Sequence, residues 1–592
     1  MVLLKVIRFV YQETSNITIS TTIGADEGEA GHNTVRGFVC GFEGDTAGDI
    51  AATDRDAEDG IDYNAEGDVL RVKLDPFGDA SGFIGNNGNR AEDLAYSNCK
   101  HVRPRAFFSD RTANTKQLVG QSTKRYPQKS DLIRSYISAA QQLATMACVY
   151  TALGTNLGDK LVNLENALTM LSQLVGPVQV TSRLYTTRAQ YVEDQPVFLN
   201  LVARLKTELK PIELLEALKT IEREIGRTRS LRYGPRLIDV DILFFDDLTL
   251  KTNTKEGPLI IPHERISERD FVLAPMCDVA PDLLHPVLKQ SMQCLYDALK
   301  NGTQRCIVPV PMLPVDKNAP WSLGSKTLIM GIVNVTPDSF SDGAELETTG
   351  AAVEKALEME RAGVDIIDIG GESSRPGAEP VTEEEELRRV LPVICGIREK
   401  SKIAISVDTT KAEVARQAVG AGANMVNDIS AGLNDDAMLA TVAMLRVPIV
   451  LMHMRGTPQT MTSLKEYENV VAEVAEVLHE RVIAAEAAGI FRWNIIVDPG
   501  IGFAKARCLN LKLLRKLSVV KKLCQGLPLL VGPSRKGFIG EICGRSEPKD
   551  RLWGTAATCC AAIEQGADIL RVHDGAEMVD VAKMSDAIWR EE

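Results

Sequence analysis

Eight apolar runs, each ending in polar or charged residues and followed by a helix-like stretch, repeat between Lys326 and Asp574 of this 592-residue chain. The runs are TLIMGIVNVT, VDIIDIGGES, KIAISVDTT, ANMVNDIS, PIVLMHMR, NIIVDPG, PLLVGPSRK and ADILRVHD. Near-continuous Val, Ile and Leu runs suit strands that are buried on both faces. Eight of them alternating with helices predict a (β/α)8 barrel, the TIM-barrel architecture. Because such barrels build their sites where the strands finish, we expect the polar residues to converge on one mouth.

The length of the chain exceeds what one hydrophobic core usually supports and predicts two or three domains. A net charge of −13 argues against a general nucleic-acid binder but leaves room for a local basic site that holds phosphates. No run of about 18 apolar residues is present, which argues against a membrane-spanning segment and against the membrane as a partner. Twelve cysteines without a CxxC pair predict reduced, buried thiols. This pattern indicates a cytoplasmic protein, with the mitochondrial matrix as the alternative.

Residues 1–145 carry Gly, Asp, Asn and Thr clusters with little periodicity, and we leave this extension unassigned, as a disordered or poorly ordered segment. Its first 24 residues are nearly free of acids and carry only Lys5 and Arg8 as cations, which weakly matches a transit peptide. A targeting segment and a mis-assembled reading frame therefore stay open as alternatives.

Residues 146–299 have the texture of a compact α+β unit. CVYTALGTN, FLNLVARLKT and RLIDVDILFF predict strands, and leucines from Leu161 to Leu171 recur at helical spacing. A second helix is predicted from Pro211 to a stop at Gly226. Residues 300–325 are rich in proline and break both periodicities, so we expect a linker that leads to the barrel at 326–592.

Asp239 and Asp241 are two residues apart on a predicted strand, so their side chains point to the same face. Two carboxylates in an apolar strand repel each other unless a cation binds them, which favours Mg²⁺ over a pair of solvent-facing acids on an edge strand. Four arginines crowd the preceding loop: Arg227, Arg229, Arg232 and Arg236. Paired Asp beside such a loop is typical of nucleoside triphosphate chemistry, because metal and guanidinium groups share the phosphate charge.

Four ordered segments between about residues 147 and 290 resemble the motifs of 6-hydroxymethyl-7,8-dihydropterin pyrophosphokinases: ALGTNLGD, YVEDQPVFLN, RYGPRLIDVDILFF and PHERISERDFVLAP. The resemblance implies a ferredoxin-like fold and transfer of a diphosphate from ATP to a pterin hydroxymethyl group. It implies that Asp239 and Asp241 hold Mg²⁺ and that Asn200 binds a pterin stacked between Phe198 and Phe271. It also implies contacts to ATP from Arg227, Arg236, His263 and Arg269. The chain departs from the family pattern in a shorter loop between Arg229 and Tyr233 and in the missing proline after Thr187.

Polar residues end all eight runs of the predicted barrel. The expected ring consists of Asn334, Asp338, Glu372, Arg375, Asp408, Asn427, Asp428, His453, Arg455, Asp498, Ser534, Arg535, Lys536, Arg571 and His573. A buried carboxylate such as Asp498 can accept two N–H bonds from the edge of a pterin-like ring and so fix its orientation. Lys536 can donate to the ring carbonyl, and Arg571 with His573 can stabilise a departing diphosphate.

These strand ends resemble dihydropteroate synthases over about residues 326–585, through MGIVNVTPDSFSDG, DIGGESSRPGA, SVDT, NDISAG, HMRGTPQTM, DPGIGF, GPSRKGF and RVHD. The resemblance implies attack of the p-aminobenzoate amine on a pterin methylene, with loss of diphosphate and with Mg²⁺ near Asn334. The implied pterin ligands are Asp408, Asn427, Asp498 and Lys536, and the implied diphosphate ligands are Arg375, Arg571 and His573. Ser374 and Ser534 are implied to lie near the p-aminobenzoate; Ser374 replaces the usual Thr, and the Thr that usually follows the matching Lys505 is missing.

The two resemblances together predict a bifunctional folate-biosynthesis enzyme, with ATP as co-substrate. The expected partners are small molecules and a second copy of the chain, since synthase barrels of this kind are usually dimers. Three alternatives stay open: one half is a non-catalytic pterin-binding or scaffolding module, the barrel is a corrinoid-linked methyltransferase, or the extension adds a dihydroneopterin aldolase. The NVTPDSFSDG segment disfavours the methyltransferase.

Overall fold

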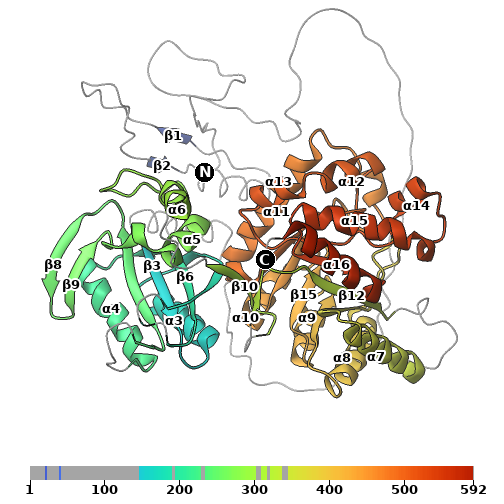
Figure 1. Ribbon diagram of the computed structural model, residues 1–592, viewed down its shortest axis with the longest axis horizontal. Helices are drawn as coiled ribbons and strands as arrows, with labels where there is room; N and C mark the ends of the chain where they lie inside the picture. The colour runs from blue at the N-terminus through green and yellow to red at the C-terminus, as the bar shows by residue number, and fades with distance from the viewer. Residues whose placement is uncertain are drawn as a thin grey trace, which may run out of the picture. The chain divides into compact units, whose positions relative to one another are not determined.

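The computed structural model describes residues 20–22, 39–41, 146–189, 192, 194–227, 234–301, 309–316, 320–335 and 345–590. Strands β1 (Ser20–Thr22) and β2 (Val39–Gly41) pair antiparallel. Our predictions for the rest of the extension lie outside the described residues. The later elements form an α+β domain and a barrel domain, which belong to one compact unit (Figure 1).

The α+β domain is built on an antiparallel sheet with the strand order β5-β6-β3-β7. These strands are β3 (Ala147–Thr155), β5 (Leu184–Thr187), β6 (Phe198–Thr207) and β7 (Asp239–Phe245), and β4 (Val178–Thr181) also pairs with β6. Helix α3 (Lys160–Leu174) follows β3, and helix α4 (Pro211–Glu224) follows β6. This order of strands and helices is the ferredoxin-like arrangement, so the predicted fold of this domain is confirmed.

Helices cover both faces of this sheet (Figure 1). On one face, Leu164 and Leu168 of α3 and Leu218 of α4 pack in a cluster with β3 and β6. Helices α5 (Asp270–Val279) and α6 (Met292–Asn301) pack against the other face, where Leu273 and Met292 are fully buried. A separate hairpin consists of β8 (Leu250–Thr254) and β9 (Gly257–Ile261).

The segment predicted as a linker contains two strands, β10 (Val310–Leu313) and β11 (Trp321–Ser322). Strand β10 pairs with β5 and extends the sheet of the α+β domain. Leu313 and Leu323 then pack with the first residues of the barrel strands, such as Leu328 and Ile366. The predicted linker is therefore also packed on both domains, because its alternating apolar residues give it a buried face on each.

The barrel domain contains eight parallel strands in the order β17-β16-β15-β14-β13-β12-β19-β18. The backbone N–H of Val497 donates to the carbonyl of Pro528 at 2.9 Å, which joins the two ends of the sheet and closes the barrel. The predicted barrel is thus confirmed. Its strands are β12 (Leu328–Asn334), β13 (Ile366–Gly370), β14 (Ala404–Asp408), β15 (Met425–Asp428), β16 (Ile449–Met452), β17 (Ile495–Asp498), β18 (Leu530–Val531) and β19 (Ile569–Val572).

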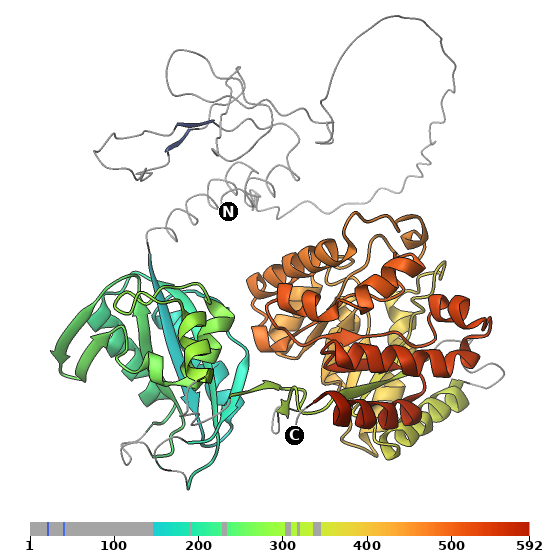
Figure 2. The same ribbon diagram turned by 45° about the horizontal axis from the view of Figure 1, so that its top comes forward.

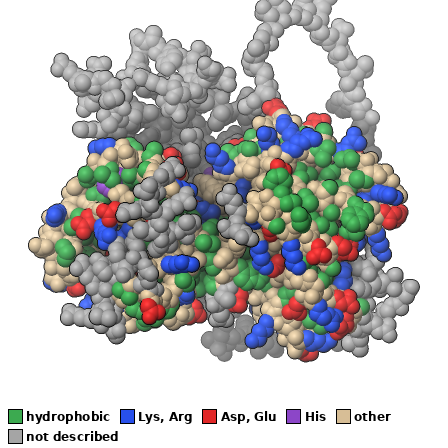
Figure 3. Space-filling model, in the orientation of Figure 1, with side chains coloured by type: hydrophobic (Ala, Val, Ile, Leu, Met, Phe, Trp, Pro, Cys, Tyr) green, Lys and Arg blue, Asp and Glu red, His purple; other side chains and the backbone are tan. Residues whose placement is uncertain are grey.

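Helices surround these strands, as Figure 2 shows. They are α7 (Glu345–Arg361), α8 (Glu383–Arg398), α9 (Ala412–Gly420), α10 (Met438–Leu445), α11 (Val470–Ala487), α12 (Arg507–Leu514), α13 (Leu517–Leu523), α14 (Gly537–Cys543), α15 (Leu552–Glu564) and α16 (Gly575–Trp589). The 3-10 helices are η1 (Ile266–Glu268), η3 (Met461–Ser463), η4 (Arg492–Asn494) and η5 (Pro548–Arg551). Acidic and basic side chains are interspersed on the described part of the face in Figure 3. Within the described ranges, every helix is too short or too polar to cross a membrane.

The cysteines depart partly from the prediction. All nine that the structure describes are free thiols. Cys524 and Cys559 are buried as expected, whereas Cys294, Cys395, Cys508 and Cys543 are exposed. The prediction of buried thiols is wrong for these four, because their helices turn that position outward.

Candidate active sites

A cavity of about 600 Å³ lies in the α+β domain where β3, β6, β7 and α5 meet. Residues from all four elements line it. The lining includes eight of the predicted site residues: Phe198, Asn200, Arg227, Arg236, Asp239, Asp241, Arg269 and Phe271. The residues that the sequence resemblance points to therefore line one concave site.

Asp239 is the centre of the charged side of this cavity. Arg227 Nη1 lies 2.5 Å from Asp239 Oδ1, and Arg236 Nη1 lies 2.5 Å from Asp239 Oδ2. Burial acts to raise the pKa of Asp239, but the two guanidinium groups outweigh it and hold the pKa below its ordinary value. The carboxylate therefore stays ionised and keeps both arginines aimed into the cavity.

Asp241 lies on the same face of β7 as Asp239, as the strand periodicity predicts. Burial, and then the charge of Asp239, raise the pKa of Asp241 to about 6. Two carboxylates that oppose each other's ionisation in a cavity form a site that a divalent cation would relieve. Magnesium is usually held by one or two carboxylates together with substrate phosphates, so the donors present fit this ion.

Glu222, on α4, supports the charged side and was missed by the sequence analysis. Its Oε1 lies 2.6 Å from Arg227 Nη1 and 2.8 Å from Lys219 Nζ, and it accepts a hydrogen bond from the backbone N–H of Val240 at 3.0 Å. The side chain is only 5% exposed, although helix periodicity alone gives no reason to bury an acid. Glu222 fixes both Arg227 and the start of β7.

The aromatic and amide side of the cavity carries the groups expected to hold a planar ring. The Asn200 side chain donates to Thr187 Oγ1 at 2.8 Å, which orients its amide. Gly154 faces it, and a Cβ at that position would lie 2.9 Å from Asn200 Oδ1, so a side chain there would displace the amide. The Arg269 guanidinium lies 5.5 Å from the centre of the Phe271 ring. The amide of Asn200 and the ring of Phe271 thus each have a neighbour that helps to position them.

His263 is set apart from the other predicted residues. Its Nδ1 accepts a hydrogen bond from the backbone N–H of Arg265 at 3.2 Å, and the residue is not among those that line the cavity. Burial, and then Arg269, lower its pKa to about 4, so it is neutral at pH 7. Its contact with ATP stays a prediction. Arg229, Arg232 and the shortened loop that contains them lie outside the described residues.

The strand register of the barrel places the predicted ring at one end. Asn334 pairs with Gly370, Gly370 with Asp408, and Asp408 with Asn427 along three successive strand pairs. Asp498 is the last residue of β17. All of these positions lie at the carboxyl ends of their strands, as the alternation of strand and helix predicts. Asp338 lies outside the described residues.

Arg571 joins several members of this ring. Its Nη2 lies 2.5 Å from Asp408 Oδ2, and its Nε lies 2.6 Å from Asp368 Oδ2. The Asn427 amide donates to the same Asp368 oxygen at 3.2 Å. Burial raises the pKa of Asp408, although Arg571 acts in the opposite direction. A cation is thus fixed between two carboxylates inside the mouth.

Asp498 and Lys536 form a second group in the mouth. Asp498 Oδ1 accepts a hydrogen bond from the backbone N–H of Gly500 at 2.7 Å, and burial raises the pKa of Asp498 to about 6. Lys536 Nζ lies 4.0 Å from the centre of the Phe503 ring. Burial, and then the charge of Arg571, lower the pKa of Lys536 to about 8, while Asp498 and Asp408 act to raise it. The predicted core of the site is therefore brought together.

Several predicted ligands have less direct placements. His573 Nδ1 lies 3.1 Å from Ser534 Oγ, and burial, followed by Arg535 and Arg571, lowers the His573 pKa to about 3. Ser534 is thereby held by His573 and is 4% exposed. Ser374 and Arg375 lie in the loop after β13, where the Arg375 backbone N–H donates to Ser373 Oγ at 3.4 Å. Their substrate roles stay predictions.

Four residues of the predicted ring hold loops instead. Asp428 accepts hydrogen bonds from the backbone N–H groups of Ser430 and Gly432. The other three form ion pairs: Glu372 with Lys411, Arg455 with Glu473 and Arg535 with Asp574. Each of these residues has its charge met by a neighbouring loop or helix, and a contact from them to a ligand stays a prediction.

Both domains match families of known proteins. Residues 150–281 match the family model of 7,8-dihydro-6-hydroxymethylpterin-pyrophosphokinase (HPPK), and residues 330–573 match that of the pterin binding enzymes. The chain is 40% identical over 479 residues to the folate synthesis bifunctional protein of Arabidopsis thaliana, a match that covers 76% of this chain and 97% of that protein. The chain belongs to the family of bifunctional folate synthesis proteins.

Two further relatives extend this placement in the bifunctional folate synthesis family. The folic acid synthesis protein fol1 of Schizosaccharomyces pombe is 44% identical over 444 residues, or 74% of this chain, which thus spans about three-fifths (59%) of that longer protein. The structure of Plasmodium falciparum HPPK-DHPS with pteroate is 25% identical, with a TM-score of 0.63, and the match covers 75% of this chain and 98% of that one.

The sequence analysis did not predict two buried residues of the barrel mouth. Asp368 is fully buried within β13, where only its alternation with Gly370 signals that it points to the interior. Lys505 is 5% exposed, and its Nζ lies 3.0 Å from His453 Nδ1 and donates to the carbonyls of Gly500 and Phe503 at 3.0 Å. Lys505 therefore holds the loop that follows Asp498.

Proposed function

We propose that this chain catalyses two consecutive reactions of folate biosynthesis. The α+β domain transfers a diphosphate from ATP to 6-hydroxymethyl-7,8-dihydropterin and releases AMP. The barrel domain condenses the resulting pterin diphosphate with p-aminobenzoate to give 7,8-dihydropteroate and diphosphate. The observation that carries the proposal is that one chain holds an arginine-lined carboxylate cavity and a barrel mouth with an arginine fixed between carboxylates.

In the first reaction, Asn200 binds the pterin between the rings of Phe198 and Phe271, because these groups line one side of the cavity. Arg227 and Arg236 act on the phosphates of ATP from the opposite side, and Arg269 and His263 complete the contacts to the nucleotide. Facing groups that hold both substrates in one cavity make the attack of the hydroxyl oxygen on phosphorus effectively intramolecular.

Asp239 and Asp241 would hold Mg²⁺ in this cavity. Among the described side chains, no group of three or more His, Cys, Asp or Glu residues forms a metal-binding cluster. Two carboxylates suit an ion that takes its remaining ligands from phosphates and water. When bound, Mg²⁺ supplies positive charge that offsets the negative charge of the transferred diphosphate.

In the second reaction, Asp408, Asn427, Asp498 and Lys536 bind the pterin ring in the barrel mouth. Arg571, His573 and Arg375 receive the diphosphate as the carbon–oxygen bond breaks, and the amine nitrogen of p-aminobenzoate then attacks the methylene carbon and loses a proton. Asn334, the last residue of β12, is the candidate ligand for a second Mg²⁺ site. Ser374 and Ser534 lie on loops at the carboxyl end of the barrel, where we place p-aminobenzoate.

A coupled assay tests the proposal with the purified full-length chain. ATP, Mg²⁺, 6-hydroxymethyl-7,8-dihydropterin and p-aminobenzoate are supplied, and AMP and dihydropteroate are measured separately. Formation of both supports the proposal. Formation of AMP alone, or of dihydropteroate only from preformed pterin diphosphate, would show instead that one half is a non-catalytic pterin-binding module.

Compartment and assembly are further parts of the proposal. The relatives from Arabidopsis thaliana and Pisum sativum include proteins named as mitochondrial, whereas another Arabidopsis relative carries no such term. We propose a cytoplasmic protein, with the mitochondrial matrix as the alternative, and a homo-oligomer formed through the barrel domain. Imaging of the tagged chain and light scattering of the purified protein test the two points.

A further inference from the structure

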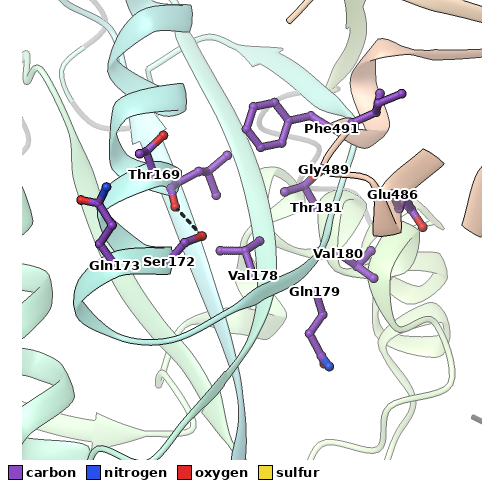
Figure 4. Close-up of a pocket in the computed structure, with 12 residues that line it drawn as sticks. Thr169, Ser172, Gln173, Val178, Gln179, Val180, Thr181, Glu486, Gly489 and Phe491 are labelled. Atoms are coloured by element: carbon purple, nitrogen blue, oxygen red, sulfur yellow. Dashed lines mark hydrogen bonds between the residues drawn. The ribbon is translucent and has the colours of Figure 1, made fainter. Parts of the chain in front are cut away.

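The loop between α11 and β17 of the barrel domain enters the core of the α+β domain. Its Phe491 and Trp493 rings stack with their centres 4.5 Å apart. Trp493 is 1% exposed and packs in the same buried cluster as Leu168 and Leu205 of the α+β domain. Figure 4 shows Phe491 across from Thr181, at a cavity of about 310 Å³ that residues of both domains line. Part of the α+β core is therefore supplied by the barrel.

Arg492, between these two aromatic residues, joins the domains through a set of buried hydrogen bonds. Its Nε lies 2.7 Å from Glu486 Oε1, and its Nη2 donates to Gln525 Oε1 at 2.8 Å, both within the barrel domain. Its backbone N–H donates to Thr181 Oγ1 at 3.2 Å, and its Nη1 donates to the backbone carbonyl of Asp278, both in the α+β domain. Arg492 is 5% exposed, and its backbone nitrogen and all three of its side-chain nitrogens each donate at least one hydrogen bond.

Asp278, next to last in α5, ties this contact to strand β5. Its carboxylate accepts hydrogen bonds from the Arg183 backbone N–H at 3.0 Å, from Arg183 Nη2 at 2.6 Å and from the Tyr185 hydroxyl at 2.9 Å. Arg183 Nη1 in turn donates to the carbonyl of Gly526, in the barrel domain, at 2.8 Å. The barrel domain is therefore hydrogen-bonded both to the end of α5 and to the residue that precedes β5.

The other ends of these two elements line the cavity proposed to bind pterin. Helix α5 begins at Asp270, next to Phe271, and strand β5 ends at Thr187, which accepts the hydrogen bond from Asn200. A ten-residue helix is about 15 Å long, and α5 joins Asp278 to Phe271 within one helix that contains Pro275, so a shift at Asp278 displaces the helix that carries Phe271. Asp278 therefore connects the barrel to the helix that carries Phe271 and to the strand whose Thr187 holds Asn200.

We infer that Arg492 of the barrel domain is a positioning residue for the pterin pocket of the α+β domain. The inference rests on the proposed function, since it assigns the Asn200 and Phe271 side of the cavity to the pterin. Removing one partner from a buried charged network leaves the others without compensation, so they rearrange. The expected result is a weakened grip on the pterin with the reacting groups themselves untouched.

The test uses the full-length chain with Arg492→Gln and, separately, Tyr185→Phe, which deletes only the hydroxyl that Asp278 accepts from. AMP formation is measured against pterin concentration at saturating ATP. We expect KM for the pterin to rise by about threefold to thirtyfold in Arg492→Gln, with KM for ATP nearly unchanged. Tyr185→Phe should change KM in the same direction, and the double variant should be no worse than the worse single variant.

Arg446→Gln is the matched control. Arg446 is also a barrel residue that crosses the interface, with its Nη1 3.0 Å from Glu165 Oε2 and its Nη2 donating to Thr169 at 3.2 Å. Both partners lie on α3, which is not part of the network around Asp278. This variant loses an interdomain contact at a more exposed arginine, and its KM for the pterin should match that of the wild type.

The outcomes separate positioning from loss of folding. Partial unfolding lowers the apparent kcat of both reactions and leaves KM unchanged, because only the folded fraction binds. Unchanged KM in Arg492→Gln, or an equal rise in Arg446→Gln, overturns the inference. If Arg492→Gln fails to fold, Tyr185→Phe alone decides. A wild-type chain that forms no AMP would instead reject the proposed function.

Discussion

Arg571 Nη2 lies 2.5 Å from Asp408 Oδ2, although β19 and β14 are separated in the closed sheet by β12 and β13. The contact therefore crosses the interior of the barrel. A guanidinium in this position serves two adjacent regions of the mouth, one lined by carboxylates and one that extends toward His573. It gives the mouth an electrostatic polarity that suits the negatively charged pterin diphosphate of the proposed reaction.

Replacing Asp239 with alanine should abolish AMP formation and spare the condensation. The change removes the carboxylate that holds Arg227 and Arg236 and that would bind Mg²⁺. We expect a loss of at least about a hundredfold in kcat for AMP formation, measured by chromatography of the nucleotides. Condensation of preformed pterin diphosphate by the same sample is the control. Loss of both activities would contradict two separate sites.

Asp241 should show opposite effects on stability and activity. Its folded pKa of about 6 exceeds the ordinary value of 3.8, so its ionised form destabilises the fold at neutral pH. The destabilisation is fully present above pH 6 and disappears as the pH falls through the unfolded value. Asp241→Asn should therefore raise Tm at pH 7.5, with a smaller gain at pH 4, while AMP formation falls. An equal or lower Tm at pH 7.5 would refute this expectation.

Lys536 should set the alkaline limit of the condensation. Its pKa of about 8 means that the ammonium group is lost as the pH rises through that value. We expect kcat/KM for the pterin diphosphate to fall above pH 8 in the wild type. Lys536→Ala should lower this parameter by about tenfold to a hundredfold at pH 7, abolish the alkaline limb and leave AMP formation intact. A normal rate in Lys536→Ala would make the assignment of the second site wrong.

Asp368 should act through Arg571. Asp368→Asn keeps the shape of the side chain but removes the charge that Arg571 Nε and the Asn427 amide meet at one oxygen. A misplaced guanidinium should lower kcat for the condensation by about tenfold to a hundredfold. The measurement is steady-state release of diphosphate. Asp365→Asn, at a partly exposed carboxylate that pairs with Lys326 outside the mouth, serves as the comparison and should stay near the wild-type rate.

The sequence predicts the barrel well because its strand runs are long, apolar and regularly spaced. It predicts Asp408, Asn427 and Asp498 for the same reason, since each of them ends a run. It misses Asp368, which lies inside a run, and it does not reveal the ion pairs that Arg455 and Arg535 form with partners distant in sequence. Local periodicity carries no information about such partners.

Arg492 illustrates a second limit. In the sequence it is one cation between two aromatic residues in a short loop, a pattern that fits a solvent-exposed turn. Its burial depends on Asp278 and Thr181, more than 200 positions away along the chain, as the separations of 214 and 311 residues show. Only the packing of two complete domains creates that environment.

The segment that carries β10 and β11 determines where the chain can be divided into two separately folding domains. Its first strand extends the sheet of the α+β domain, and its apolar side chains pack against the first residues of the barrel strands. If the chain is divided within this segment, the α+β fragment loses a strand of its sheet, or the barrel fragment exposes the apolar residues that this segment covers. Separate expression of the halves would succeed only if both inherited a copy of these few residues.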